Sequence, residues 1–183
     1  GYELQVGQPK VIIKEIDGLF KVIHLNRFRE TKGVRFDIFP PEFMGKFSGI
    51  DRVIHDGFAV SPGKVGTVER PWYMHPHQGD NLVVLYGRRH VDLYNKAHGK
   101  VEKFIVTPDE IYQNGKLVCS VPSMLVWPPN VFHRVESKDL GSASLNFAYR
   151  EEGFNVKDNF DIFSLNTDTG EYKVIREGHK DQF

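Results

Sequence analysis

The 183-residue sequence carries 24 Lys and Arg residues against 24 Asp and Glu residues, so its formal net charge is zero. This balance gives no bulk field to attract nucleic acid or an anionic membrane, and we expect neither partner. Apolar residues make up 40% and aromatic residues 13% of the chain, which predicts one packed domain rather than a disordered chain.

The longest apolar runs, such as residues 82–86, are far too short to cross a bilayer. The single cysteine, Cys119, excludes an internal disulfide and fits a reducing compartment. We therefore expect a cytoplasmic protein.

Short alternating or apolar runs follow one another along the chain and are separated by Gly, Pro and Asn, a pattern typical of a β-sandwich or β-barrel. The best helical candidate is a short turn at residues 107–110, and a turn signal at residues 166–170 predicts a C-terminal hairpin. We expect one all-β domain over residues 1–183, with strands at 11–16, 20–25, 35–39, 52–60, 66–70, 72–77, 82–86, 90–94, 101–105, 116–121, 123–127, 133–136, 143–150, 161–165 and 171–176.

Three histidines are the most informative residues. His75 and His77 are two apart in an expected strand, so their side chains should share one face. Two imidazoles on an inward face need partners for their nitrogens, and a divalent metal ion supplies them. His133 begins a later strand after a proline-containing turn, and a shared barrel could bring it against the first pair.

These residues resemble the two motifs of the cupin superfamily. The His75-x-His77 pair and Gly87 match the first motif, and Pro128-x-Asn130-x-x-His133 matches the second, with Asn in the place of Gly. Asn is the non-glycine residue that best tolerates the left-handed backbone such a turn often requires. The resemblance covers roughly residues 58–150 and implies a jelly-roll barrel with N- and C-terminal β extensions. It also implies one bound divalent metal ion (Fe, Ni, Zn or Mn).

The sequence departs from the first motif at the fourth ligand. The family has a glutamate after the histidine pair, whereas this chain has Asp80 and Asn81. Asp80 keeps the expected six-residue spacing to Gly87, so it is the candidate carboxylate ligand. Otherwise water completes the site, or Asn81 or Gln78 acts as a weak oxygen donor. Two further departures are Glu69 at the first glycine position and Ser137 at the final asparagine position.

Five residues are candidates for contact with a small-molecule ligand: Trp72, Asn81, Arg89, Asn146 and Tyr149. Arg89, beside Arg88, could bind a phosphate or carboxylate, or the two could form an exposed pair of charges in a hairpin. Asn146 could face the pocket or solvent, and the aromatic residues could instead pack in the core.

The resulting hypothesis is a metal-dependent cupin enzyme of oxygenase, isomerase or lyase type that acts on a small sugar or organic acid. One alternative is a non-catalytic module that binds or senses such a molecule. A second is relatedness to nucleotide-sugar epimerases of the same barrel type, which use a His–Asp and Tyr acid–base set rather than a metal. Strand-like segments outside the motifs also predict a homodimer, because pairing with a second subunit covers extra edge strands.

Overall fold

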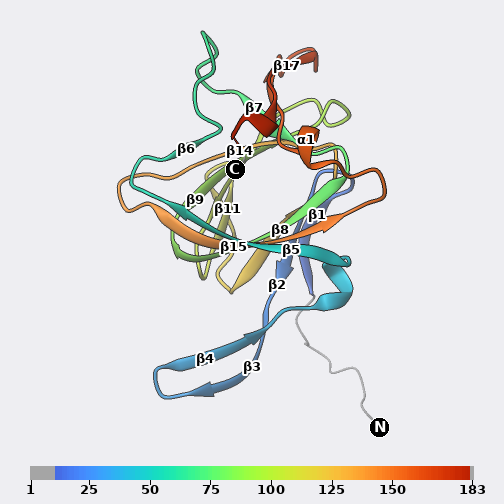
Figure 1. Ribbon diagram of the computed structural model, residues 1–183. Helices are drawn as coiled ribbons and strands as arrows, with labels where there is room; N and C mark the ends of the chain where they lie inside the picture. Colours follow the sequence, from blue (N-terminus) through green and yellow to red (C-terminus); the bar gives the residue numbers. More distant parts are fainter. Residues whose placement is uncertain (1–10, 182–183) are drawn as a thin grey trace.

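A computed structural model describes residues 11–181 of the chain (Figure 1). The ends of the expected domain, residues 1–10 and 182–183, lie outside the described residues. The elements are β1 (Ile12–Ile16), β2 (Phe20–His24), β3 (Asn26–Thr31), β4 (Val34–Ile38), η1 (Pro41–Phe43), β5 (Phe47–His55), β6 (Val60–Ser61), β7 (Trp72–Met74), β8 (Gln78–Gly87), β9 (Arg89–Tyr94), β10 (Glu102–Val106), β11 (Ile111–Gln113), β12 (Lys116–Cys119), β13 (Ser123–Trp127), β14 (Phe132–Glu136), β15 (Ser142–Arg150), α1 (Val156–Asn159), β16 (Ile162–Leu165), β17 (Tyr172–Arg176) and η2 (Gly178–Asp181).

Two antiparallel sheets form a barrel, which confirms the expected all-β class. One sheet has the order β1-β2-β13-β8-β15-β5, and the other has the order β12-β11-β10-β9-β14-β7-β16-β17, with β6 also paired to β14. The β3–β4 hairpin forms a separate two-stranded sheet that projects from the barrel, as Figure 1 shows. The strands of both motifs thus lie in the barrel wall, with β7 and β14 directly paired.

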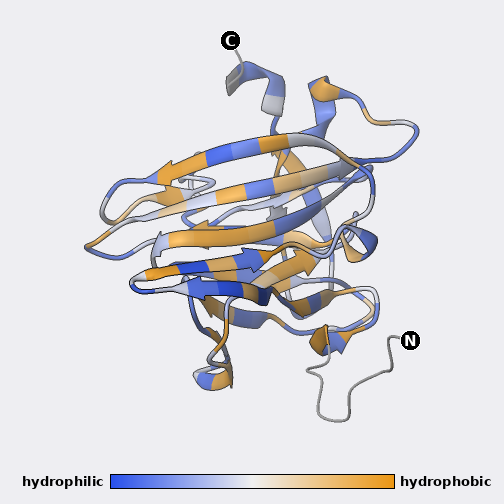
Figure 2. Ribbon diagram, turned by 90° about the horizontal axis from the view of Figure 1, so that it is seen from below, coloured by the Kyte–Doolittle hydropathy of each residue, from blue (hydrophilic) through white to orange (hydrophobic). Residues whose placement is uncertain are grey.

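Side chains alternate between the barrel interior and its outer faces, and Figure 2 shows the mixed hydropathy that this produces along the strands. On β8, Leu82 and Val84 pack inside with Val91 and Leu93 of β9, whereas Val83 packs on the outside with Met124 and Phe147 among others. This period of two, carried through β8, β9 and β15, decides which polar residues of the site face inward.

Most expected strands are present, but two of those observed, β3 and β11, are absent from the sequence-based set. β3 lies in the projecting hairpin and is almost wholly exposed, so it has no apolar alternation, and β11 has only three residues. The expected strand at 66–70 is wrong, because the only pairing there is one bridge between Val65 and Val68. The residues at 107–110 form a turn rather than a helix, in which the Thr107 hydroxyl accepts from two backbone amides.

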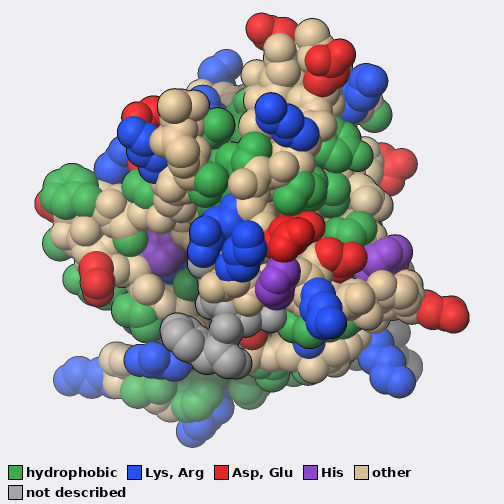
Figure 3. All heavy atoms as spheres, turned by 45° about the horizontal axis from the view of Figure 1, so that its top comes forward, with side chains coloured by type: hydrophobic (Ala, Val, Ile, Leu, Met, Phe, Trp, Pro, Cys, Tyr) green, Lys and Arg blue, Asp and Glu red, His purple; other side chains and the backbone are tan. Residues whose placement is uncertain are grey.

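Basic and acidic side chains are interspersed on the face shown in Figure 3, consistent with the balanced composition. Among the described residues, no helix has the length and apolar character needed to cross a membrane.

Candidate functional site

A cavity of about 220 Å³ lies inside the barrel between the two sheets. Its lining comes from β5, β7, β8, β9, β13, β14 and β15, from the turn between β7 and β8, and from Phe160 in the segment that follows α1. The lining residues are Asp51, Val53, Tyr73, His75, Gln78, Asp80, Leu82, Arg89, Trp127, His133, Val135, Ser144, Asn146 and Phe160.

His75, Asp80 and His133 meet in this cavity. All three are buried, and one potential ligand atom from each lies within 4.8 Å of those of the other two. The Nε2 atom of His75 is 3.5 Å from Oδ2 of Asp80, and the rings of His75 and His133 are 4.6 Å apart between centroids. The structure therefore brings together residues from both sequence motifs.

Backbone carbonyls fix the orientation of both imidazoles. Nδ1 of His75 lies 2.5 Å from the carbonyl oxygen of Asn159, and Nδ1 of His133 lies 3.1 Å from that of Val131. A carbonyl oxygen only accepts hydrogen bonds, so each Nδ1 carries the proton and donates it. In the neutral rings Nε2 is then the free acceptor.

Asp80 is held by two amide side chains. Its Oδ1 accepts hydrogen bonds from Gln78 Nε2 at 2.8 Å and from Asn146 Nδ2 at 2.9 Å, which leaves Oδ2 beside His75. Gln78 is itself fixed, because its Oε1 accepts from Asn159 and Arg150. This chain of contacts orients the carboxylate toward the histidines.

Burial, followed by the positive charge of His75, lowers the pKa of His133 to about 4. His133 is therefore neutral at pH 7 and presents its Nε2 lone pair to the cavity. The turn before it contains Asn130 with φ of 69°, which confirms that this position requires a left-handed backbone.

The expected shared strand face of His75 and His77 is wrong. β7 ends at Met74 and β8 starts at Gln78, so residues 75–77 form a turn and the period of two does not pass through them. His77 is not in the His75–Asp80–His133 group, and its ring lies against Gly153. The inward face of β8 instead starts with Gln78 and Asp80.

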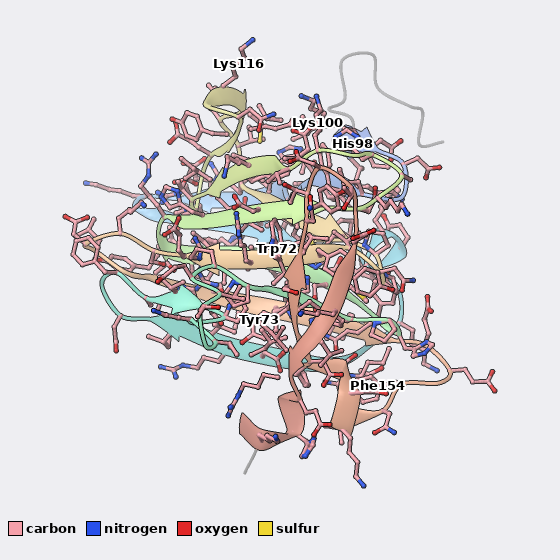
Figure 4. All side chains as sticks on the ribbon, turned by 90° about the horizontal axis from the view of Figure 1, so that it is seen from above. Trp72, Tyr73, His98, Lys100, Lys116 and Phe154 are labelled. Atoms are coloured by element: carbon pink, nitrogen blue, oxygen red, sulfur yellow. The ribbon has the colours of Figure 1, made fainter. Side chains whose placement is uncertain are left out.

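Two expected ligand-contacting residues point away from the cavity. Trp72 packs on the outer face with Tyr94, Phe132 and Phe163, whereas its neighbour Tyr73 on β7 lines the cavity (Figure 4). Asn81 follows the inward Asp80, so its side chain faces outward and donates to the carbonyls of Met44 and Phe147. Alternation along each strand accounts for both corrections.

Tyr149 also lies outside the cavity lining and packs on the backbone of Gly79. A Cβ at Gly79 would overlap the Tyr149 ring, so any larger residue there displaces the ring. We expect Gly79→Ala to lower the free energy of unfolding by about 1–3 kcal/mol, because the ring must move from a packed position. Gly63→Ala, where a Cβ meets nothing within 4 Å, is the control in urea unfolding. Equal stability of the two variants would contradict this packing.

Arg89 and Asn146, the other two expected ligand contacts, do line the cavity. Gln78, which the sequence offers as a possible oxygen donor, faces inward beside Asp80 because both residues have the same strand parity. Phe160 and the Asn159 carbonyl carry no local signal, because tertiary folding of the C-terminal segment brings them to His75.

Two polar atoms in the cavity lining are buried without a hydrogen-bond partner. They are the donor Nε1 of Trp127 and the acceptor Oδ1 of Asn146. Unpaired buried polar atoms are rare in proteins and costly. A hydroxylated ligand could satisfy both.

The buried histidines make stability pH-dependent. Burial, with a smaller effect of the Arg89 charge, lowers the pKa of His55 to about 4, and His133 has a similar value. The unfolded chain, with a histidine pKa of about 6.5, binds more protons between these values. We expect full stability above about pH 6.5 and a progressive loss as the pH falls toward about 4. The thermal midpoint measured against pH tests this. His55→Gln should flatten the profile, and a constant wild-type midpoint across this range would contradict it.

The donor set fits a divalent metal ion. Two imidazole nitrogens and one carboxylate form the arrangement of many metal sites with open positions, and here Nε2 of His75, Nε2 of His133 and Asp80 would hold the ion. These three acceptors converge in a buried space, where a cation placed between them would be stabilised.

No family model matches the sequence, and no curated protein matches it. Among solved structures, a dTDP-6-deoxy-D-glucose-3,5-epimerase from Legionella pneumophila in complex with dTDP-4-keto-L-rhamnose is similar, with a TM-score of 0.59, 11% identity, and coverage of 90% of this chain and 84% of that one. A dTDP-4-dehydrorhamnose 3,5-epimerase from Sulfolobus tokodaii is also similar, with a TM-score of 0.52 and 18% identity. The match covers 74% of this chain and 72% of that one.

A third similar structure is a sugar 3,4-ketoisomerase from Thermoanaerobacterium thermosaccharolyticum in complex with TDP. It has a TM-score of 0.51 and 12% identity, and the match covers 74% of this chain and 82% of that one. At such identities the similarity establishes the fold. The chain therefore has the jelly-roll barrel fold of these structures, which confirms the fold class expected from the sequence.

Proposed function

We propose that the protein is a sugar-processing cupin that isomerises or epimerises a small keto sugar by moving protons within the barrel. The observation that carries this proposal is the buried pair of His75 and Asp80, 3.5 Å apart at the cavity with neutral His133 beside them. The pair fits the second alternative drawn from the sequence, a relative of nucleotide-sugar epimerases, which uses a His–Asp set and a tyrosine.

Nε2 of His75 removes a proton from the carbon next to the substrate carbonyl, and the C–H electron pair enters the enolate. Asp80 stabilises the imidazolium that forms, because its carboxylate lies beside Nε2. The Asn159 carbonyl keeps Nδ1 protonated, so the reactive nitrogen is always Nε2. Return of a proton to the enolate carbon from the other face gives the epimer, and return to the adjacent carbon after enediol formation gives the isomer.

Tyr73 is the candidate acid. It lines the same cavity, its ring lies 5.9 Å from that of His133, and its hydroxyl is 3.2 Å from Ser61 Oγ. The unpaired Trp127 Nε1 and Asn146 Oδ1 supply a donor and an acceptor for substrate hydroxyls. Together these groups give the cavity the polarity that sugar recognition requires.

The comparisons support a sugar substrate, since the three similar structures are named as sugar epimerases or a sugar ketoisomerase. The cavity is small, with a volume of about 220 Å³. This space suits a single sugar ring, so any nucleotide attached to the sugar would lie outside the cavity.

The test is proton exchange. The protein is incubated in D₂O with dTDP-4-keto-6-deoxyglucose and with free keto sugars, and the substrate C–H signals are followed by NMR. We expect loss of the signal next to the carbonyl. Binding without exchange would instead support a non-catalytic sugar-binding module, and neither binding nor exchange would refute the proposal.

A metal-dependent enzyme is the second candidate, favoured by the convergence of two imidazoles and a carboxylate. When bound, a divalent ion would polarise a substrate carbonyl or hydroxyl as a Lewis acid. His75, Asp80 and His133 would hold it, without the expected third histidine. Metal analysis of the purified protein tests this, and stoichiometric metal lost in His133→Ala would support it.

We also propose a homodimer. β5 is the edge strand of its sheet, and its Ile50 and Ile54 are exposed. Tyr86 of β8 is also exposed and is level with Ile54, because both pair with Ala143 of the intervening strand β15. An exposed apolar edge is commonly covered by a second subunit. Light scattering should give a dimeric mass that Ile54→Glu reduces to a monomer, whereas a monomeric wild type would refute this assembly.

A further inference from the structure

Arg89 is a buried cation in the cavity lining that the proposed proton transfer does not use. Only 2% of its surface is exposed, although the neighbouring Arg88 is exposed on the outside of the barrel. The alternative of an exposed charge pair is therefore wrong for Arg89. Alternation across the start of β9 sends these adjacent side chains to opposite sides.

The partners of Arg89 are all neutral. Its Nε donates to Ser142 Oγ at 2.6 Å, one terminal nitrogen donates to Ser144 Oγ at 3.0 Å, and the other to the Val53 carbonyl at 3.4 Å. Among residues 11–181, no carboxylate forms an ion pair with it. Burial lowers the pKa of Arg89 to about 10, so it is still protonated at neutral pH. Arg89 is thus a buried positive charge whose direct partners are all neutral, although Asp80 and Asp51 line the same cavity, and an anionic ligand in contact with the guanidinium would stabilise it.

Two guanidinium N–H groups remain for a ligand. A guanidinium has five N–H groups in a fixed fork, and the three hydrogen bonds above leave one on each terminal nitrogen. Such a pair matches the two oxygens of a carboxylate. The Ser142 hydroxyl continues to Ser137 at 2.8 Å and then to His55 at 2.9 Å, so a buried network holds the fork in place.

The position of Arg89 defines the length of the ligand. In the β9–β14 pairing, His133 lies opposite Leu93, and Arg89 is four residues from Leu93 on the same strand. At roughly 3.3 Å per residue, its backbone is about 13 Å along the strand from the level of His133. The Arg89 guanidinium contacts Ser144 of β15, two residues from Asn146, which donates to Asp80. Arg89 and His133 line one cavity. A molecule of one sugar ring can therefore present one end to each.

We propose that Arg89 binds a carboxylate of the substrate, so that the substrate is a small sugar acid or hydroxy acid rather than a neutral sugar. The inference rests on the proposed function for the reaction at the other end of the molecule. The anion site itself stands on the burial, the neutral partners and the two free N–H groups of Arg89.

Calorimetric titration of the whole protein with matched pairs tests the carboxylate site. The probes are D-glucuronate against D-glucose, D-galacturonate against D-galactose, and inorganic phosphate. We expect the wild type to bind at least one uronate roughly 30-fold or more tightly than its neutral partner, because truncating one side of a buried charged pair typically costs this much. Arg89→Gln should remove the preference, and Arg89→Lys should restore only part of it because it lacks the fork.

Arg88→Gln is the matched control, since it removes the same charge from the adjacent exposed position and should leave the preference unchanged. If Arg89→Gln does not fold, the uronate preference of the wild type and its partial loss in Arg89→Lys still test the carboxylate site. Equal binding of acid and neutral sugars, uronate binding that survives Arg89→Gln, binding of phosphate alone, or no binding of any carboxylate would each overturn the inference.

The two proposals fail separately. His75→Gln should keep uronate binding while losing proton exchange. Exchange on neutral sugars without preference for acids would refute the carboxylate site and leave the proposed reaction standing. Uronate binding through Arg89 without exchange on any sugar acid would support the carboxylate site and refute the proposed reaction.

Discussion

Replacement of His75 by Gln is expected to lower the rate of proton exchange by roughly 10²–10⁴-fold, the usual contribution of a positioned general base. Gln keeps the approximate size of the imidazole and can donate to the Asn159 carbonyl, so the side chain stays anchored. It offers no nitrogen that takes up a proton. Exchange of the substrate C–H for deuterium, followed by NMR with the wild type and the variant side by side, measures the loss.

The neighbouring His77 provides the control. It lies outside the group formed by His75, Asp80 and His133, so His77→Gln should change the exchange rate by no more than a few-fold. A loss in His77→Gln as large as that in His75→Gln would mean that the pair works together, as the sequence motif implies. The central role given to His75 would then be wrong.

Replacement of Asp80 by Asn is expected to lower the same rate by roughly 10²-fold, because the imidazolium that forms on His75 loses the charge that stabilises it. Asn has nearly the shape of Asp and can still accept from Gln78 and Asn146 through its oxygen. The fold should therefore survive, which circular dichroism and thermal unfolding would verify. Substrate binding, measured by calorimetry, should fall much less than the exchange rate.

Asp51→Asn is the companion variant. Asp51 is an exposed carboxylate at the cavity edge, and within the described part of the chain it forms no ion pair with a histidine. Its replacement should have a small effect. Equal losses in both variants would show that the cavity needs negative charge in general rather than a carboxylate beside His75.

Sequence alone predicts the barrel because its signals are local. The period of two in residues 82–86 and 90–94, and the turn at Asn130, each follow from neighbouring residues. The spacing of the two motifs predicts His133 and Asp80 as site residues, and the structure brings both to His75. These parts of the prediction depend on no distant contact.

The parts of the site that the sequence does not predict depend on where the strands start. Pro76 lies in a turn between β7 and β8, which breaks the alternation that would have put His77 beside His75. The same start of β8 turns Asn81 outward and Gln78 inward. The carbonyl that orients His75 comes from Asn159, 84 residues later, and no local pattern signals that contact.

His75 and Asp80 act either through a proton or through a metal ion, and the proposed mechanism requires the proton. Exhaustive removal of divalent metals with a chelator, followed by the exchange assay in metal-free D₂O, decides between them. A proton-transfer site predicts that the exchange rate is unchanged after removal and unaffected by added Zn²⁺, Fe²⁺, Ni²⁺ or Mn²⁺ in stoichiometric amounts. Exchange that disappears on chelation and returns with one of these ions would contradict the proposed mechanism and establish the metal-dependent alternative.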